Sequence, residues 1–194
     1  NRIDINTKDV LKAAATKWNF SKYEPGLVGG HCIGVDPYYM SYLTKKIGLN
    51  KNNMILAGRK TNEYMNNFII KNLFRLIRLK GMKLKKSKIL ILGYTFKENC
   101  NDIRNSKILE IFKQLKNKVD KVDLFDPIAR NDQELIYFKK NILRKLNYKK
   151  KYNAVILAVK HDYFIKMNVK KILSLCDNNK LFFDLKGVFD KSYS

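Results

Sequence analysis

The chain has 194 residues and an apolar fraction of 45%, which is enough for a hydrophobic core in one domain or one and a half. It contains no run of about 18 apolar residues, so no membrane-spanning helix is expected, and the polar start at residues 1–4 is typical of the middle of a chain rather than of a secretory signal. Its three cysteines, Cys32, Cys100 and Cys176, are widely spaced and form no CxxC pair, which argues against a disulfide framework and against a metal site, and suits a reducing cytoplasm.

The formal charge of +23 is strongly positive, yet its make-up does not favour a nucleic-acid-binding protein. Of the 40 basic residues, 33 are lysines and seven are arginines. Arginine reads base edges and clamps phosphates, and here it is scarce. The densest lysine clusters, at 83–88 and 145–151, fit solvated faces or linkers. We therefore expect no specific nucleic-acid partner, while the same field would attract a small polyanion such as a nucleotide diphosphate. A basic nucleic-acid binder is the more distant alternative.

The first third of the chain predicts two short helices with a glycine-rich loop between them. Residues 7–17 read as the first helix. Four glycines then fall within nine residues, 26–34, so the backbone there can take positive φ values and approach a ligand closely. Asp36 followed by Pro37 predicts the start of the second helix, with Asp36 as its N-cap, and Gly48 marks its end.

Cys32 lies inside this glycine loop, just before the predicted second helix. A thiol near a helix N-terminus feels the positive end of the helix dipole, which favours the thiolate. That environment suits a nucleophilic cysteine. A tight turn that happens to contain a small buried cysteine explains the same residues equally well.

The longest predicted helix covers residues 53–80 and is stopped by Gly81. Its apolar positions recur at helical spacing but occupy more than one face. Such a helix would be about 42 Å long on the standard rise per residue. A long helix with apolar residues on several faces is more typical of an interface than of a lone surface helix, so we expect a homodimer formed through 53–80.

After residue 86 the pattern changes to short apolar runs that alternate with helical segments. This alternation predicts an α/β fold with a parallel sheet that helices cover on both faces. We therefore expect a helical connector and dimerisation region at 1–85, followed by a Rossmann-like parallel-sheet domain at 86–194. The expected strands are 88–93, 121–125, 154–159 and 181–185, and the expected helices are 103–116, 132–147 and a short one capped by Asp162.

The loop at 94–105, after the first strand, is the predicted ligand site of the sheet domain, because ligands settle at the carboxyl ends of such strands. It lacks the GxGxxG pattern and is too long for a tight phosphate turn, so it does not predict a dinucleotide site. Lys97, Asp102 and Arg104 suit a phosphorylated ligand. On the residues alone, a surface loop with a local Asp–Arg pair is the simpler interpretation.

Several segments resemble one enzyme family. The stretch GGHCIGVDPYY, residues 29–39, is similar to the catalytic-cysteine segment of the UDP-glucose/GDP-mannose dehydrogenase family, and residues 92–106 resemble its C-terminal substrate-domain signature. Residues 16–20 and 184–188 fit the same family, so the resemblance runs over nearly the whole chain. The nearest branch is that of the UDP-N-acetylhexosamine (glucosamine, galactosamine or mannosamine) 6-dehydrogenases. Val35 replaces a lysine of the UDP-glucose branch, which favours an N-acetylated substrate.

The resemblance implies an NAD-dependent, four-electron oxidation of a UDP-N-acetylhexosamine to the uronate, in the cytoplasm and for surface polysaccharide biosynthesis. In this family a separate N-terminal domain holds NAD, and the C-terminal domain holds the nucleotide-sugar. No dinucleotide fingerprint is present, so we expect the N-terminal NAD-binding domain to be absent and the chain alone to be inactive as a dehydrogenase. Residues 1–85 would then be the central region and 86–194 the UDP-sugar-binding domain.

The chemistry implied by the resemblance centres on Cys32. Its thiolate would trap the sugar aldehyde as a thiohemiacetal, which a second hydride transfer converts to a thioester. Asp36 would orient or deprotonate the water that hydrolyses this thioester, although a plain N-cap role explains Asp36 as well. Gly29 and Gly30 would bring backbone amides close to the sugar or to the developing oxyanion.

The resemblance also implies residues that bind the substrate and the cofactor. Lys17 falls where the family commonly has an arginine that reaches across the dimer, and a lysine lacks the planar fork of that arginine. Arg104 matches an arginine that helps to hold NAD. A non-catalytic sugar-nucleotide-binding or dimerisation module is the alternative that fits the same fold. The residues expected to contact the sugar nucleotide are Lys17, Phe20, Lys22, Tyr23, Gly29, Gly30 and Lys97.

Overall fold

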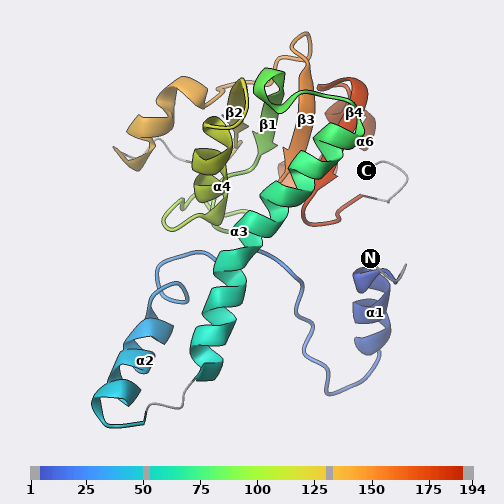
Figure 1. Cartoon of the computed structure of the whole chain (residues 1–194). Coiled ribbons are helices and arrows are strands. Elements are labelled where there is room, and N and C mark those ends of the chain that lie inside the picture. Colours follow the sequence, from blue (N-terminus) through green and yellow to red (C-terminus); the bar gives the residue numbers. More distant parts are fainter. Residues whose placement is uncertain (1–4, 50–52, 130–132, 190–194) are drawn as a thin grey trace.

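A computed structural model of the chain describes residues 5–49, 53–129 and 133–189 (Figure 1). These residues form a helical region and a sheet domain. The helical region contains α1 (Thr7–Ala14) and α2 (Asp36–Lys46), and the long helix α3 (Asn53–Leu79) runs from beside α2 to the sheet domain (Figure 1). None of the helices in these ranges combines the length and the apolar run that crossing a membrane requires.

Helix α3 joins the two parts of the molecule. Its C-terminal half places Ile69, Leu73 and Ile77 at helical spacing, and all three side chains are buried in the core of the sheet domain. Its N-terminal half lies beside α2 and leaves apolar side chains such as Met54 exposed. The predicted long helix is therefore confirmed at 27 residues, and Gly81, with a φ of 71°, lies just beyond its end.

The sheet has four parallel strands in the order β2-β1-β3-β4. Leu92, the last residue of β1, pairs with Phe125 of β2 on one side and with Leu157 of β3 on the other. The carboxyl ends of these three strands therefore meet at one edge of the sheet. The strands are β1 (Lys88–Leu92), β2 (Lys121–Phe125), β3 (Tyr152–Leu157) and β4 (Cys176–Asp184).

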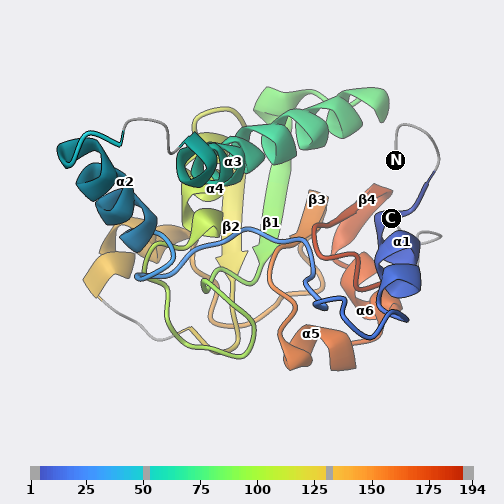
Figure 2. The ribbon, with the colours of Figure 1, turned by 90° about the horizontal axis from the view of Figure 1, so that it is seen from below.

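Helices cover both faces of the sheet (Figure 2). On one face, Ile89 and Ile91 pack with α3, α4 and η2, and on the other Leu90 and Leu92 pack with α5 and α6. Because the strands are buried on both faces, their sequences are continuous apolar runs. The predicted α/β class, with a helical region ahead of a parallel sheet, is confirmed. The helices of this domain are η1 (Leu84–Lys86), α4 (Lys107–Lys116), η2 (Gln133–Asn141), α5 (Asp162–Lys166) and α6 (Val169–Leu173).

Some predicted boundaries are wrong. The helix expected from residue 103 begins at Lys107, because Ser106 is its N-cap and its hydroxyl accepts a hydrogen bond from the Ile108 N–H at 3.3 Å. The stretch at 132–147 contains a 3₁₀ helix only as far as Asn141, and Asp132 lies outside the described residues. The last strand starts at Cys176, five residues before the predicted start.

The two predicted aspartate caps are also wrong. Helix α2 includes Asp36, and its N-cap is Val35, which makes no side-chain capping bond. The reason is that the Cys32 carbonyl already accepts the N–H groups of Val35 and Asp36, both at 2.9 Å. Asp162 likewise lies in the first turn of α5, after His161 at the N-cap.

Gly93, which directly follows β1, offers a test of this packing. Its φ is 83°, and a Cβ there would lie 2.6 Å from the Val159 Cβ. We expect Gly93→Ala to lower the free energy of unfolding by about 2–4 kcal/mol, through left-handed strain and overpacking. Gly58 in α3 is the matched control, because a Cβ there meets nothing within 4 Å. Gly58→Ala should raise stability by about 0.5–1 kcal/mol in urea denaturation, and equal effects of the two substitutions would contradict the packing described.

Candidate functional site

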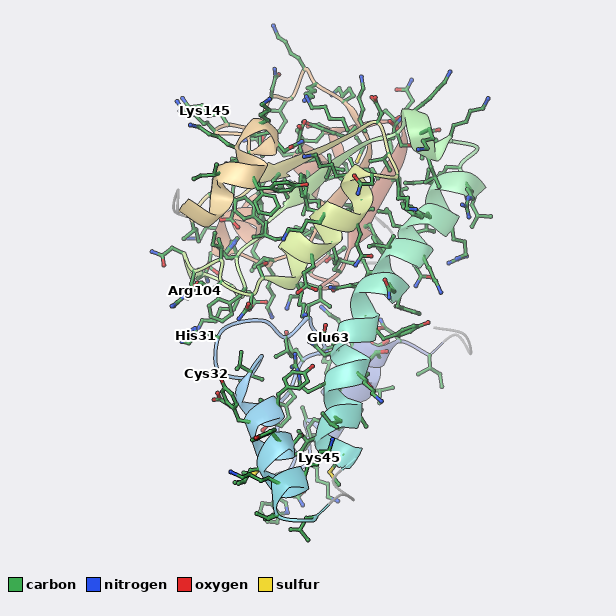
Figure 3. The ribbon with its side chains drawn as sticks, turned by 60° about the vertical axis from the view of Figure 1, so that its left-hand side comes forward. His31, Cys32, Lys45, Glu63, Arg104 and Lys145 are labelled. Carbon is green, nitrogen blue, oxygen red and sulfur yellow. The ribbon has the colours of Figure 1, made fainter. Side chains whose placement is uncertain are left out.

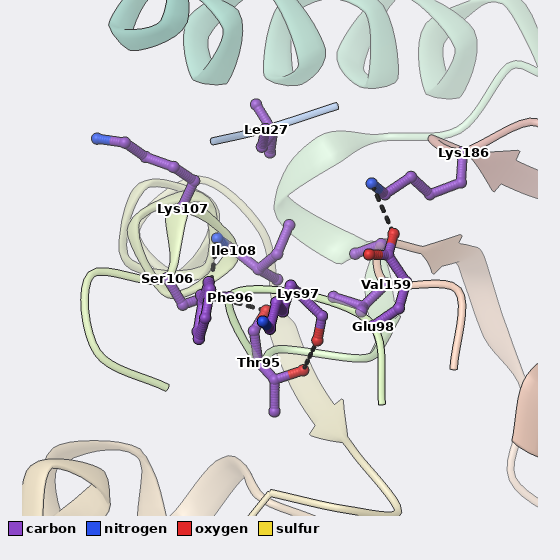
Figure 4. Close-up of a pocket in the computed structure, with 11 residues that line it drawn as sticks. Leu27, Thr95, Phe96, Lys97, Glu98, Ser106, Lys107, Ile108, Val159 and Lys186 are labelled. Carbon is purple, nitrogen blue, oxygen red and sulfur yellow. Dashed lines mark hydrogen bonds and ion pairs between the residues drawn. The ribbon is translucent and has the colours of Figure 1, made fainter. Parts of the chain in front are cut away.

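A cavity lies at the carboxyl edge of the sheet, where the strand order reverses between β1 and β3. Loops that leave adjacent parallel strands in opposite directions open a crevice at such a point. Thr95 and Phe96 after β1 line it, as do Val159 after β3 and Leu27 from the glycine-loop segment (Figure 4). Its enclosed volume is about 20 Å³, which holds a single water. A larger ligand must therefore lie across the mouth of the crevice.

Lysines surround the mouth of this crevice. Lys186 forms an ion pair with Glu98 at 2.9 Å, and Lys160 forms one with Glu24 of the glycine-loop segment. Burial would raise the pKa of Glu98, but the hydrogen bond from Lys186 outweighs it and the pKa is lowered. The Lys97 ammonium lies 5.4 Å from the centre of the Phe96 ring. Among the described residues, Lys97 forms no salt bridge. Lys97 is therefore the lining cation whose charge a ligand could pair.

Asp126 holds the start of the loop after β1, which lines the crevice. It follows β2 directly, and its side chain is fully buried. One carboxylate oxygen accepts the N–H groups of Tyr94 and Thr95, at 2.8 and 3.3 Å. The other accepts the N–H groups of Ile128 and Ala129, both at 2.9 Å. The buried charge is therefore compensated by four backbone donors that also hold the start of the β1 loop.

His161, also fully buried, completes this polar network. Its Nδ1 accepts the Asn99 N–H at 3.0 Å, so the proton of the neutral ring is on Nε2. Nε2 then donates toward Asp126 at 3.0 Å and lies 3.1 Å from the Thr95 hydroxyl. Burial alone would raise the pKa of Asp126, but the hydrogen bonds from His161 and the backbone outweigh it and lower that pKa. The loop that carries Lys97 is thus anchored at both Thr95 and Asn99.

The glycine loop docks directly on this anchored loop. A Cβ on Gly29 would lie 2.6 Å from the carbonyl oxygen of Asn105, and one on Gly30 would lie 3.2 Å from the Phe96 ring. Gly30 also has a φ of 87°, and its carbonyl accepts a hydrogen bond from the Asn105 amide at 3.2 Å. Only glycine allows this close approach of the two backbones. Two motifs that lie more than 50 residues apart in the sequence therefore form one structural unit.

Cys32 is exposed at the end of the glycine loop, so the interpretation of a small buried cysteine is wrong. Figure 3 shows Cys32, His31 and Arg104 on the side of the molecule where the helical region meets the sheet domain. Cys100 is half-buried, and Cys176 is buried, which raises the pKa of its thiol to about 12. Of the three thiols in the chain, Cys32 is the most accessible.

Arg104 and Asp102 form the expected local pair. The Asp102 carboxylate accepts from Arg104 Nε at 3.1 Å and from a terminal guanidinium nitrogen at 2.6 Å. This pairing lowers the pKa of Asp102 to about 2, and the charge of His31 adds a smaller effect in the same direction. His31 belongs to the glycine loop. The Asp102–Arg104 pair of the second motif is therefore close enough to the first motif to feel its charge.

Four of the remaining predicted site residues lie on the segment between α1 and the glycine loop. This segment crosses the carboxyl edge of the sheet (Figure 2), and the ion pair of Glu24 with Lys160 ties it to the loop after β3. Along it, Lys17, Lys22 and Tyr23 are exposed and Phe20 is half-buried. Asp36 is exposed at the start of α2.

A cluster of ion pairs that the sequence did not predict connects α3 to α4 below the glycine loop. Lys107 bonds to both carboxylate oxygens of Glu63 at 3.1 Å and to Glu110 at 2.9 Å, and Glu63 also pairs with Arg59 at 3.2 Å. Burial would lower the pKa of Lys107, but the two carboxylates outweigh it and raise that pKa. The i,i+4 spacing of Arg59 and Glu63 is visible in the sequence, whereas the partner 44 positions away is not.

Other residues of the site were missed for a similar reason. The network of Asp126 and His161 joins positions 35 apart, and neither residue was singled out from the sequence. An aspartate directly after a buried strand was the available signal for Asp126, since strand ends gather at one edge. Across the described ranges, no three His, Cys, Asp or Glu side chains gather in a way that could hold a metal ion.

Comparison with known protein families identifies the family of this chain. Residues 1–64 match the model of the UDP-glucose/GDP-mannose dehydrogenase family, central domain, and residues 90–191 match the UDP binding domain of the same family. The chain belongs to the UDP-glucose/GDP-mannose dehydrogenase family. The resemblance stated from the two motifs is therefore confirmed.

Among members of this family, the chain is 42% identical over 195 residues to the UDP-N-acetyl-D-glucosamine 6-dehydrogenase of Salmonella typhi, covering 100% of this chain and 45% of that protein. It is 38% identical over 194 residues to the enzyme of the same name from Pseudomonas aeruginosa, covering 100% and 46%. The chain thus spans less than half the length of the curated relatives it matches. Both relatives carry names from the branch that the resemblance implied.

Solved structures of the dehydrogenase family share the fold. The UDP-D-ManNAc dehydrogenase from Pyrococcus horikoshii superposes with a TM-score of 0.81 at 24% identity, over 98% of this chain and 42% of that one. The NDP-N-acetyl-D-galactosaminuronic acid dehydrogenase from Methanosarcina mazei Go1 gives 0.86 at 20% identity, over 100% and 42%. At these identities the likeness establishes the architecture.

The buried carboxylate of Asp126 predicts a pH dependence. Its pKa in the folded state lies below the ordinary value of 3.8, so its stabilising effect is fully present above that value and is lost as the pH falls through the folded pKa. We expect Asp126→Asn to cost about 2–4 kcal/mol of unfolding free energy at pH 7, because it disturbs a buried network. The difference from wild type should shrink below about pH 4.

Asp120→Asn serves as the control for this experiment, since Asp120 is exposed at the opposite edge of the sheet. It should change stability by less than about 0.5 kcal/mol at pH 7. A loss in Asp126→Asn that stays constant from pH 7 to pH 3 would contradict the assignment.

Proposed function

We propose that this chain is the cysteine-bearing and UDP-sugar-binding part of an NAD-dependent nucleotide-sugar 6-dehydrogenase, which oxidises a UDP-N-acetylhexosamine to the uronate in the cytoplasm, for surface polysaccharide biosynthesis. The observation that carries the proposal is the docking of the Cys32 loop on the loop of Lys97, at the crevice of the sheet. The relatives that are 42% and 38% identical, named as UDP-N-acetyl-D-glucosamine 6-dehydrogenases, support the substrate class.

In this proposal the nucleotide lies across the mouth of the crevice. Lys97 pairs with the diphosphate, because the other two lysines that line the crevice, Lys107 and Lys186, already pair with carboxylates. The segment with Phe20 and Tyr23 crosses the same edge and is suited to contact the nucleoside or the sugar. Lys17, Lys22, Gly29 and Gly30 complete the proposed set of substrate contacts.

The reacting carbon of the sugar then lies beside Cys32. Its thiolate adds to the C6 aldehyde, whose oxygen takes up a proton to give a thiohemiacetal. Loss of a hydride from that carbon to the acceptor, together with loss of the hydroxyl proton, then gives a thioester. Water attacks the thioester, and the carboxylate of Asp36, four residues along at the start of α2, orients that water or accepts its proton. The tetrahedral product collapses to the carboxylate and releases the thiolate.

The sheet of this chain does not fit NAD as its main binding site. The N–H groups of Tyr94 and Thr95, which would face a pyrophosphate in a dinucleotide-binding turn, both donate to Asp126. NAD supplies the hydride acceptor when it is bound, and we assign its main site to a domain outside this chain. Arg104, exposed where the two motifs meet, is the proposed contact to it from this side. The chain alone should therefore not produce NADH.

We assign residues 1–85 to the central region and 86–194 to the UDP-sugar-binding domain, with homodimer formation through α3. The support for a dimer is an apolar surface on α2 and the adjoining half of α3. Tyr39, Tyr42 and Met54 are 68%, 67% and 87% exposed, and α2 buries only Thr44 among its side chains. Exposed apolar side chains grouped in this way are typical of an interface.

Isothermal titration with UDP tests the binding step. Lys97→Ala should weaken UDP binding roughly 10- to 100-fold, because it removes a charge-assisted contact to phosphate. Lys118→Ala is the control, since Lys118 is exposed just before β2, at the other edge of the sheet, and its loss changes the net charge equally. Equal weakening by both substitutions would indicate a general electrostatic attraction and contradict the assigned site.

A further inference from the structure

On the side that faces α3 and α4, part of the glycine loop borders a cavity and not packed side chains. This second cavity has a volume of about 110 Å³. Gly29 and Gly34 of the loop form one wall, and charged side chains of α3 and α4 form the other. The Nε of Arg59 lies buried on this second wall without a hydrogen-bond partner among the described residues. Since packing does not support the loop from this side, hydrogen bonds must hold it.

Asn62 of α3 supplies two of those hydrogen bonds. Its Oδ1 accepts the Val28 N–H at 3.0 Å, and its Nδ2 donates to the Val28 carbonyl at 2.9 Å. One side chain thus satisfies both backbone groups of a single loop residue, as a neighbouring β-strand would. Asn62 is half-buried, and its amide has no other hydrogen-bond partner in the described part of the chain.

The loop is held from the opposite side two residues later. Gly30 contacts Phe96, and its carbonyl accepts from the Asn105 amide at 3.2 Å. The loop is therefore fixed at Val28 by the helical region and at Gly30 by the sheet domain, and Cys32 follows two residues further on. Among the described residues, the two bonds of Asn62 are the hydrogen bonds that tie this loop directly to α3.

We propose that Asn62 is a positioning residue for Cys32: it holds the glycine loop across the cavity so that the thiol meets the sugar end of a ligand bound at the crevice. The proposal rests on the proposed function, in which Cys32 reacts with that sugar. It assigns Asn62 no contact with the ligand, and it makes the geometry of the site depend on α3, the helix with the exposed apolar face.

Hydrogen exchange of the loop measures this role without any ligand. Asn62→Ala removes both bonds to Val28, and Asn62→Asp keeps the acceptor but replaces the donor with a carboxylate oxygen that repels the carbonyl. We expect exchange in peptides covering 26–36 to be about tenfold faster in Asn62→Ala, and also faster in Asn62→Asp. Asn67→Ala, at an exposed position of the same helix, is the control and should leave exchange in these peptides unchanged.

A second measurement compares two ligands. The affinity for UDP-N-acetylglucosamine should fall about tenfold in Asn62→Ala, whereas the affinity for UDP should change less than about twofold, because the sugar meets the loop and the nucleotide meets Lys97. A role in stability alone would lower the melting temperature and leave the ratio of the two affinities unchanged.

The outcomes separate this inference from the proposed function. Unchanged exchange in both Asn62 variants overturns the inference, even if UDP binds as proposed. Faster exchange with an unchanged ratio of affinities also overturns it, since the loop would then not position anything at the sugar. If wild type binds neither ligand, the proposed function fails, and the exchange experiment still decides whether Asn62 holds the loop.

Discussion

The close contact between the glycine loop and the turn after β1 is the constraint on which the rest of the site depends. At Gly29 and Gly30 the absence of a side chain lets one backbone approach the Asn105 carbonyl and the Phe96 ring. This contact joins the helical region to the sheet domain at the point where a parallel sheet offers its crevice. It brings the loops of Cys32 and Lys97, two exposed residues, together in the proposed site.

Such a contact fixes the position of the glycine loop only if the loop after β1 is itself held in place. Asp126 and His161 hold that loop by burying a carboxylate whose partners are backbone N–H groups and one neutral imidazole. An unpaired carboxylate in this place would be strongly unfavourable, so the β1 loop cannot leave its position without losing several hydrogen bonds at once. The same bonds occupy the N–H groups that a dinucleotide would need. This network therefore favours a ligand held at the rim by lysine over one held in the turn.

The sequence predicted those features that local patterns determine. The apolar runs of β1 and β3 indicated strands buried on both faces, and the spacing of Ile69, Leu73 and Ile77 indicated the long helix. Predictions of helix starts from local residues were wrong. At Asp36 the backbone has already begun to turn, because the carbonyl of Cys32 accepts the Asp36 N–H, so the helix includes Asp36 and does not start after it. At residue 103 the loop continued until Ser106 could cap the helix.

The interior of the site could not be predicted, because its partners are distant in the sequence. Asn62 and Val28, Lys107 and Glu63, and His161 and Asp126 meet only after the helices and strands have packed. The two motifs themselves carried enough information to suggest the family. Their direct contact through Gly29 and Asn105 became visible only in three dimensions.

The most direct test of the account is the rate at which iodoacetamide modifies Cys32, followed by mass spectrometry of its peptide, with a free thiol such as glutathione in the same tube as the reference. If the loop holds Cys32 at the sugar end of the crevice, saturating UDP-N-acetylglucosamine should slow this modification at least tenfold, and UDP alone should slow it much less. An unchanged rate at Cys32 while the nucleotide-sugar is shown to be bound would contradict the account.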